Sequence, residues 1–310
     1  MTNTSPSCAT SAAVYAVVVT YGSDAARLVA QFERLLLQVQ AIIWVDNGSG
    51  APLQQLQTRW SPQRVQPIFL DQNQGIAVAQ NRGIECALAC GASHILLMDD
   101  DSLPAPDMVA RLLAVLQKYP EAGAVGACHT DSRRGVARSP FLTVQGGRAR
   151  WLPCTDPEQV WAVDHVIASG CLIPAPVLQV VGLMREDFFI DWVDVEWCWR
   201  ARNHGYRIFG ACGALLEHSL GDKVVQVLGQ EVALHAPWRH YYQSRNCLLT
   251  LRARQMDMPT RWNVMLRQCK RFVAFSLLVP GRWQYFTMAL RGFFDGYRGR
   301  SGPLVQPGGR

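Results

Sequence analysis

The sequence predicts an α/β fold in which a mixed, mostly parallel sheet of Rossmann-like type is flanked by helices. Three observations support this prediction. Four short apolar runs alternate with segments of helical spacing, and each run ends in a cluster of polar or acidic residues. Near the C-terminus, two longer segments have the pattern of amphipathic helices.

The first third of the chain contains the alternating pattern. Strands are predicted at residues 14–20, 41–45, 65–70 and 94–98, and helices at 24–39, 76–90 and 105–119. Parallel strands joined by right-handed crossovers bind ligands outside their carboxyl ends. The polar residues that follow these strands are therefore expected to line one crevice, although each cluster alone also suits a turn or a cap. They are Thr20, Tyr21, Asp46, Asn47, Gly48, Ser49, Asn73, Gly75, Asp99 and Asp101.

Three consecutive carboxylates end the fourth run, at Asp99, Asp100 and Asp101. If the strand alternation continues, Asp99 and Asp101 point to one side and Asp100 to the other. Adjacent carboxylates repel one another, so a divalent cation that carries phosphate oxygens, Mg²⁺ or Mn²⁺, would neutralise them. The alternative is a turn that caps the helix introduced by Pro104 and Pro106.

The middle of the chain is less regular. A strand is predicted at 124–128, and the Gly- and Arg-rich segment 133–151 forms either a hairpin or a loop. The apolar segment 163–173 contains Ser169 and Gly170, where the glycine marks either close approach of a ligand or backbone or a bulge.

A second acidic cluster lies among aromatic residues at Asp191, Asp194 and Glu196. Aromatic neighbours desolvate carboxylates and raise their pKa, which suits a general base. Asp194 is expected in the first turn of a helix that stops at 204–205, with Glu196 four residues before Arg200. The alternative makes Asp194 the helix N-cap and Glu196 a surface ion-pair partner.

Short strands are predicted at 206–209 and 214–216, and His218 follows the second. This histidine is either a structural hydrogen-bonding residue or an additional metal ligand. A helix opens at Pro237, and its Arg and Tyr side chains either contact phosphate or pack at the sheet edge.

Two amphipathic helices are predicted at 261–278 and 282–297. The segment 252–300 holds ten Lys or Arg residues but only two acids, Asp257 and Asp295. A basic amphipathic pattern suits an anionic membrane surface, a subunit interface or docking onto the core.

Composition limits the cellular setting. The 310 residues have a net charge of +6, and we expect no nucleic-acid partner, while oligomerisation is left open. The ten cysteines form no Cys-x-x-Cys pair and lie mostly in apolar runs, so they are interpreted as small buried hydrophobes and not as a disulfide framework or zinc site. A reducing compartment follows, and we expect a cytoplasmic protein, with the inner face of the cytoplasmic membrane as a peripheral site.

With these residues in hand, the chain resembles the family 2 glycosyltransferases of the GT-A fold, from about Val14 to about Leu251. Within them it is similar to bacterial rhamnosyltransferases that build cell-surface polysaccharide such as O-antigen. The resemblance rests on four motifs in order: Val-Val-Thr-Tyr at 18–21, Val-Asp-Asn-Gly-Ser at 45–49, Asn-Gln-Gly-Ile-Ala at 73–77 and Met-Asp-Asp-Asp-Ser at 98–102. The segments at 169–171, 188–200 and 241–246 look like the rhamnosyltransferase versions.

The resemblance implies a role for each matching residue. Thr20 and Asp46 would hold the base and ribose, Asn73 and Gly75 would border the nucleotide pocket, and Tyr21, Asp100, Ser169 and Gly170 would belong to the same donor site. Asp99 and Asp101 match the family's Asp-x-Asp, with Asp101 and His218 at the metal. Asp194 matches the catalytic base, but Val193 replaces the usual Glu, so Asp191 and Glu196 stay open as the acidic partner or acceptor contact.

The activity implied is inverting, metal-dependent transfer of a sugar, with dTDP-L-rhamnose expected as donor and a UDP-hexose second. The acceptor would be a saccharide or a lipid-linked saccharide. The implied organisation is a disordered segment 1–12, a GT-A domain 13–250 and a basic helical segment 251–310. Two rivals stay open: a haloacid-dehalogenase-like phosphatase that uses Asp99 and Asp101, and a non-catalytic nucleotide-sugar-binding, membrane-associated protein.

Overall fold

The computed structural model describes residues 12–131, 135, 138–145, 147–218, 223–227 and 230–304, so the predicted disordered segment lies outside it except for Ala12. The strands are β1 (Val14–Thr20), β2 (Ala41–Asp46), β3 (Val65–Phe69), β4 (His94–Asp99), β5 (Ser102–Pro104), β6 (Ala122–Thr130), β7 (Phe141–Gln145), β8 (Arg148–Leu152), β9 (Val160–Val163), β10 (Cys171–Pro174), β11 (Arg207–His218), β12 (Lys223–Val227) and β13 (Gln230–Leu234). The helices are α1 (Ala25–Leu35), α2 (Ala51–Gln54), α3 (Ile76–Ala89), α4 (Met108–Lys118), α5 (Ala175–Val181), α6 (Val193–Asn203), α7 (Pro237–Arg252), α8 (Met258–Leu278) and α9 (Arg282–Tyr297), with short 3-10 turns at Gln55–Arg59 and Glu186–Phe188.

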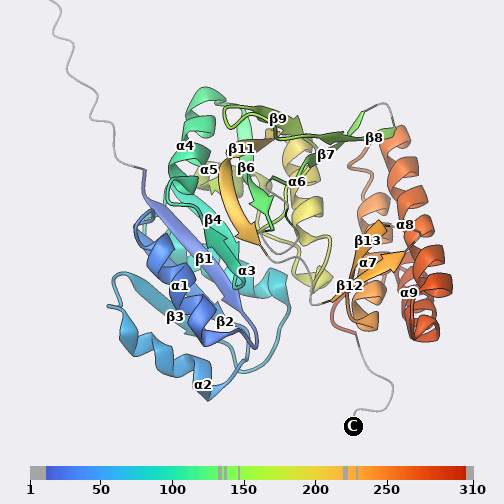
Figure 1. Cartoon of the computed structure of the whole chain (residues 1–310), viewed down its shortest axis with the longest axis horizontal. Helices are drawn as coiled ribbons and strands as arrows, with labels where there is room; N and C mark the ends of the chain where they lie inside the picture. The colour runs from blue at the N-terminus through green and yellow to red at the C-terminus, as the bar shows by residue number, and fades with distance from the viewer. Residues whose placement is uncertain are drawn as a thin grey trace, which may run out of the picture.

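One sheet organises the molecule (Figure 1). Among the described residues its strand order is β3-β2-β1-β4-β10-β6-β11-β5, with β9 paired to β11. The strands β3, β2, β1 and β4 run parallel, as does the pair β6 and β11, whereas β10 is antiparallel to both β4 and β6. The predicted mixed, mostly parallel sheet is confirmed.

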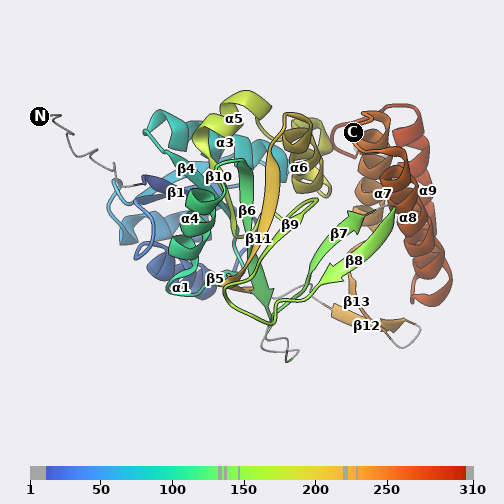
Figure 2. The same ribbon diagram turned by 90° about the horizontal axis from the view of Figure 1, so that it is seen from above.

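The central strands are apolar throughout because helices cover both faces of the sheet (Figure 2). Along β1, Val17 and Val19 pack with α3, α5 and α6, while Ala16 and Val18 pack with α1 and α4 on the other face. This two-sided burial explains why β1 shows a continuous apolar run and not an alternating one.

Strand register brings the polar strand ends together. Thr20 lies opposite Asp46, and Val19 lies opposite Asp99 on the other side of β1. The carboxyl ends of β1, β2 and β4 therefore form one edge of the sheet, which is the expected place for a ligand site.

Several predicted boundaries were wrong. β4 ends at Asp99 and a short strand, β5, follows the turn, so the helix expected from residue 105 begins only at Met108. The segment 163–173 is not one strand, because Gly170 lies at φ +78° in a turn before β10. Residues 207–218 form one strand and not two, with a register shift between Ala211 and Leu215. The segment 133–151 contains a hairpin, β7 and β8, within its described residues.

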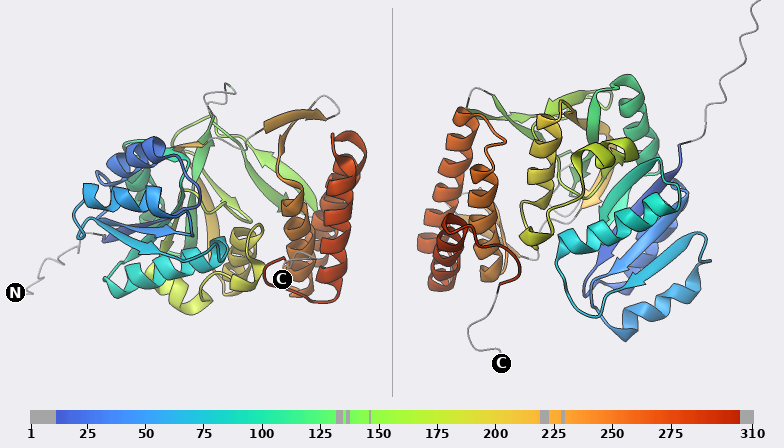
Figure 3. Two further views of the ribbon diagram at one scale, coloured as in Figure 1. Left: turned by 90° about the horizontal axis from the view of Figure 1, so that it is seen from below. Right: turned by 180° about the vertical axis from the view of Figure 1, so that it is seen from behind.

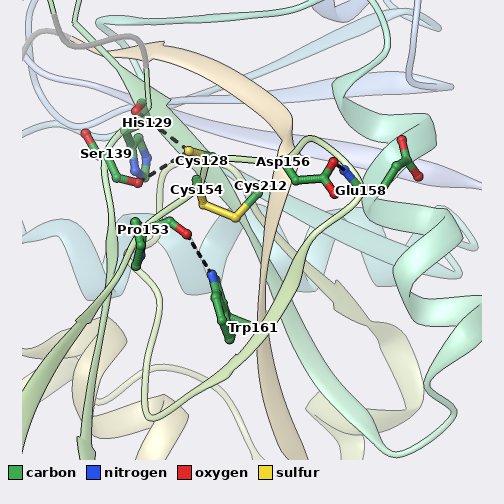
Figure 4. Close-up of a disulfide and its surroundings, with 9 residues drawn as sticks. All are labelled: Cys128, His129, Ser139, Pro153, Cys154, Asp156, Glu158, Trp161 and Cys212. Atoms are coloured by element: carbon green, nitrogen blue, oxygen red, sulfur yellow. Dashed lines mark hydrogen bonds between the residues drawn. A yellow bond between two sulfur atoms is a disulfide. The ribbon is translucent and has the colours of Figure 1, made fainter.

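The cysteine interpretation was also wrong in part, because Cys154 and Cys212 form a disulfide (Figure 4). The antiparallel pairing of β9 with β11 brings the two together, since Cys212 donates its backbone N–H to the carbonyl of Gln159 at 3.0 Å. Cys128 packs beside the disulfide as a buried thiol. With this disulfide present, the cysteine content does not indicate a reducing compartment.

We expect the Cys154→Ala/Cys212→Ala variant to lose roughly 2–4 kcal/mol of unfolding free energy, because the bridge closes a long loop in the unfolded chain. The sequence separation is 58 residues. Urea denaturation without reductant measures the loss, and Cys269→Ala, at an exposed free cysteine, is the control with a change within about 0.5 kcal/mol. Equal stabilities of the double variant and the parent would contradict the prediction.

Helices α7, α8 and α9 lie together at the end of the molecule opposite β2 and β3 (Figure 3). Tyr241 of α7 donates its hydroxyl to the Asp295 carboxylate of α9 at 2.9 Å. The predicted boundary between residues 250 and 251 falls in the last turn of α7, and the division into two domains stays a prediction. Among the described residues, we find no helix with the length and apolarity that crossing a membrane requires.

Candidate active site

Hydrogen bonds from α1 hold the turn from Asp99 to Ser102 in place. The buried Gln31 of α1 donates its amide to the backbone carbonyls of Asp99 and Ser102, at 2.5 Å and 2.7 Å. Asp100 accepts a hydrogen bond from the Ser23 hydroxyl. Since β4 ends at Asp99, the predicted strand alternation does not decide where Asp100 and Asp101 point.

Burial raises the pKa of the Asp100 carboxyl, and the neighbouring charge of Asp101 raises it further, against the bond from Ser23. Adjacent carboxylates that disfavour one another's ionisation are the setting in which a cation is stabilised. The turn therefore brings together mutually repelling carboxylates, as the three consecutive aspartates predicted.

Ser169 and Gly170 pack directly behind this turn. The Ser169 hydroxyl accepts the Asp99 backbone N–H at 3.2 Å and lies 2.9 Å from the Ser102 hydroxyl. Gly170 has φ +78°, and a Cβ there would lie 2.7 Å from the Cβ of Ala127 and 2.9 Å from Leu216 Cδ2, so the left-handed backbone and the packed side chains explain the glycine.

Asp194 lies in the first turn of α6, as predicted, and Trp192 rather than Asp194 is the N-cap. Its carboxylate accepts the backbone N–H groups of Ala168 at 3.2 Å and Val195 at 2.8 Å. Burial raises the pKa of the Asp194 carboxyl, although these two hydrogen bonds lower it. A carboxylate with a raised pKa is suited to accept a proton.

The two acidic clusters converge, although they are far apart in the sequence. Asp194 accepts from Ala168, and the next residue, Ser169, accepts from Asp99, so consecutive residues connect the two carboxylate-bearing segments. Burial alone would lower the pKa of Arg239, but the charges of Asp191, Asp99 and Asp194 raise it. The charges of all three carboxylates therefore act on one guanidinium, which contacts Asp191 directly.

The loop 188–192, which carries Asp191 of the second cluster, has a strained conformation. Phe189, Asp191 and Trp192 have φ between +62° and +69°, a region that costs non-glycine residues about 1–3 kcal/mol each. The Asn246 amide of α7 donates to three carbonyls of this loop, those of Phe188, Ile190 and Asp191. Buried bonds from α7 therefore hold the loop in place.

Arg239 of α7 completes the connection between the loop and α7. Its guanidinium makes a bidentate pair with Asp191, at 2.7 Å and 3.1 Å. Glu196, in contrast, is 1% exposed and binds Arg200 at 3.0 Å and Gln255 at 3.2 Å. The predicted pair at four-residue spacing is confirmed, but it is buried rather than on the surface, and it occupies the Glu196 carboxylate.

Thr20 and Asp46 form a buried relay beside the acidic turn. The Trp44 indole donates to the Thr20 hydroxyl, which donates to Asp46, both at 2.9 Å. The second oxygen of Asp46 accepts the Ser49 backbone N–H at 3.0 Å. Tyr21, the next residue of the motif, is 59% exposed.

Asn73 and Gly75 connect the turn after β2 to the loop 188–192. The Asn73 side chain accepts from Asn47 at 3.1 Å and from the Gly75 backbone N–H at 2.9 Å. Gly75 has φ +93°, and a Cβ there would lie 2.7 Å from Phe189. The predicted nucleotide loop and the loop 188–192 are therefore in contact.

The residues present fit a divalent cation held partly by substrate. Hard cations prefer carboxylate oxygens, and Mg²⁺ is usually bound by one or two carboxylates plus substrate phosphates. The Asp99–Asp101 turn offers such oxygens, while in the described part of the chain three or more metal-ligating side chains do not gather. His218 pairs with Ser102 through the β11–β5 backbone, but its side chain lies outside the described residues.

Sequence reasoning assigned no role to Gln31 and Ser23, which support the aspartate turn. For Arg239 it left open a phosphate contact or packing at the sheet edge, and the pairing with Asp191 was not predicted. A polar Gln31 on the otherwise apolar inner face of α1 was the one available signal, because a buried amide requires hydrogen-bond partners.

Comparison with known proteins agrees with this geometry. Residues 15–167 match the family described as Glycosyl transferase family 2. The dTDP-rhamnosyl transferase RfbF of Shigella flexneri is 30% identical over 297 residues, which cover 93% of this chain and 97% of that protein.

Two solved structures share the fold. S. aureus TarS 1-349 in complex with UDP-GlcNAc superposes with a TM-score of 0.60 at 14% identity, covering 91% of this chain and 81% of that chain. GalNAc-T7 with UDP, GalNAc and Mn²⁺ superposes with a TM-score of 0.54 at 12% identity, covering 66% of this chain and 42% of that chain. The predicted GT-A fold is confirmed by these likenesses.

Proposed function

This chain belongs to glycosyl transferase family 2, and on that premise we propose that it transfers L-rhamnose from dTDP-L-rhamnose to a saccharide or lipid-linked saccharide, with inversion. Family membership makes the chain a glycosyltransferase, so the phosphatase and the non-catalytic binder are set aside. The name of the Shigella relative supports the donor. A UDP-hexose is the second candidate.

The observation that carries the proposal is the convergence of Asp99 and Asp194 on the consecutive residues Ser169 and Ala168. A glycosyltransferase needs one group that grips the donor and another that activates the acceptor on the opposite side of the sugar. Two carboxylate-bearing segments that meet at one site, one beside the predicted nucleotide pocket, suit these two tasks.

We assign the donor side to the edge formed by β1, β2 and β4. The buried Thr20–Asp46 pair orders the turn that would hold base and ribose, with Asn73 and Gly75 on its far side and Tyr21 at its rim. Asp99 and Asp100 would face the diphosphate-sugar, and Ser169 holds the backbone N–H of Asp99. Asp101 and His218 would hold Mg²⁺ or Mn²⁺, which offsets negative charge on the departing diphosphate.

The reaction begins with activation of the acceptor hydroxyl. Asp194 removes the proton from an acceptor hydroxyl as its oxygen bonds to the anomeric carbon. The bond from that carbon to the phosphate oxygen breaks, and its electron pair leaves with the nucleoside diphosphate. Attack from the side opposite the leaving group inverts the anomeric centre. Asp191, held by Arg239, lies beside the entering acceptor.

A thermal-shift screen of nucleotide sugars tests the donor assignment. We expect dTDP-L-rhamnose to raise Tm only when Mn²⁺ is present, because a ligand at one hundred times its Kd adds roughly 2.7 kcal/mol of stability. UDP-hexoses, dTDP alone and Mn²⁺ alone are the comparisons.

An equal shift in EDTA would contradict the role of the cation. A shift with a UDP-hexose and none with dTDP-L-rhamnose would overturn the proposed donor.

A further inference from the structure

The outer faces of α8 and α9 are apolar where they meet solvent. We call this set the hairpin face, and it consists of Trp262, Leu266, Val273 and Leu277 on α8 and Trp283, Leu290, Phe294 and Tyr297 on α9. Trp262 is 69% exposed, Leu277 64% and Trp283 70%. Side chains of this size are rarely left in water in such numbers on one surface.

Helix α8 exposes apolar residues that a surface helix usually buries. Its apolar stripe has the spacing of one helical face, and that face points to solvent. Its buried positions include the polar Thr260 and Gln268. The inner faces of both helices are packed already, through Phe275 on α8 and Tyr285 on α9. The hairpin face is therefore not required for the core.

The two stripes form one continuous surface. Phe272 of α8 contacts both Phe286 and Phe293 of α9, with ring centroids 5.5 Å and 5.6 Å apart. Near the turn between the helices, Phe272, Leu277, Trp283 and Phe286 line a cavity of about 360 Å³, with Arg282 at its edge. An apolar cavity that opens on an apolar surface has room for a hydrocarbon chain.

Exposed basic residues lie on the same two helices as this surface, and the two acids of segment 252–300 have other partners. Arg267, Lys270, Arg282 and Arg298 are exposed on the same two helices or directly after them. Of the two acids in segment 252–300, Asp257 caps α8 through the Thr260 N–H at 3.1 Å. Asp295 is buried against Tyr241 and pairs with Arg300 at 3.1 Å.

We propose that the hairpin face binds the surface of an anionic lipid bilayer, with its Trp, Leu and Phe side chains among the headgroups and upper acyl chains. Apolar residues rimmed by Lys and Arg are the pattern that such surfaces attract. A second copy of the chain is disfavoured, because pairing two such faces would bring the two basic rims together. The inference goes beyond the transfer reaction and does not depend on the identity of the donor.

Vesicle co-sedimentation of the full chain tests the proposal. Vesicles of phosphatidylglycerol and phosphatidylcholine should bind the protein, pure phosphatidylcholine vesicles should bind it at least about tenfold more weakly, and added salt should reduce binding. The Leu277→Glu/Trp283→Glu variant should lose at least about tenfold in binding, since a carboxylate cannot enter the apolar layer. Lys270→Glu/Arg282→Glu should reduce binding to the anionic vesicles and leave the weak binding to pure phosphatidylcholine vesicles unchanged.

Leu37→Glu is the matched control, because Leu37 is 87% exposed between α1 and β2. This variant should bind vesicles as the parent does. All substituted side chains are exposed, so each variant should keep the parent's Tm and its donor-induced thermal shift, which separates failure of this proposal from failure of the proposed function. Equal binding to neutral vesicles, or unchanged binding of the Leu277→Glu/Trp283→Glu variant, would overturn the proposal. The proposal would also be overturned if the parent bound no vesicles and formed a stable dimer in light scattering that the Leu277→Glu/Trp283→Glu variant did not form.

Discussion

Replacing Asp194 by Asn should lower the rate of sugar transfer by about 10²–10⁴-fold, the range expected when a general base is lost. Asn keeps the size of the side chain and one oxygen that accepts a backbone N–H, so α6 should begin in the same place. Donor binding should persist, because the change lies on the acceptor side. We expect kcat to fall while the donor-induced thermal shift is retained.

Asp164→Asn is the matched control for this variant. Asp164 is also a buried aspartate, but it directly follows β9 and binds Thr143 of β7 at 3.2 Å and Arg202 at 2.9 Å. Its replacement should lower stability and leave transfer within a few-fold of the parent. Full transfer activity of Asp194→Asn would remove Asp194 from the mechanism and leave Asp191 as the next carboxylate to examine.

The pH profile provides a second readout for Asp194. Burial raises the pKa of this carboxyl, and a base works only when deprotonated, so activity should rise with pH through a value above that of an ordinary aspartate. The sign for stability is opposite. The folded state holds this proton more tightly than the unfolded state, so the contribution of Asp194 to stability falls as pH rises between the ordinary and the raised pKa. The acid limb should vanish from the residual activity of Asp194→Asn.

The fold was predictable where burial leaves a simple pattern. β1 and β4 are covered on both faces, so their side chains form apolar runs whose ends are marked by Thr20 and Asp99. β11 was split in two because Gly210 and Gly213 interrupt its apolar pattern, yet pairing with β6 and β9 carries the strand through. Local pattern does not contain that information, because the partners are distant in sequence.

The site was predictable in its residues but not in its connections. The Asp191–Arg239 pair depends on the backbone of 188–192, where Phe189, Asp191 and Trp192 adopt positive φ that their residue types do not favour. The bonds from Asn246 that hold this backbone come from a helix that begins 46 residues after Asp191, at Pro237. The Cys154–Cys212 bridge was missed for the same reason, since strand pairing and not spacing brings the sulfurs together.

Replacing Asp101 by Asn should abolish the Mn²⁺-dependent part of donor binding and lower transfer by roughly 10²–10³-fold, the loss typical when charge stabilisation of a leaving group is removed. Asp101 lies in the turn that Gln31 anchors through Asp99 and Ser102, so the backbone should stay in place without its carboxylate. Calorimetric titration with Mn²⁺ and dTDP-L-rhamnose measures the loss directly. The affinity for the donor should become independent of the cation, while the affinity for dTDP alone in EDTA should not change.

Asp107→Asn is the matched control, because Asp107 is an exposed aspartate that pairs with Arg111 at the start of α4, close in sequence to the turn. It should keep both Mn²⁺ dependence and rate, since an exposed pair contributes little.

The Asp100→Asn variant removes the same charge from the neighbouring position, so it tests which aspartate of the turn binds the cation. Asp100 is bound by Ser23, so its loss should weaken donor binding without removing the cation requirement. If Asp101→Asn kept its response to Mn²⁺ and Asp100→Asn lost it, the cation would be assigned to Asp100, and the turn would present its carboxylates in the reverse of the order proposed.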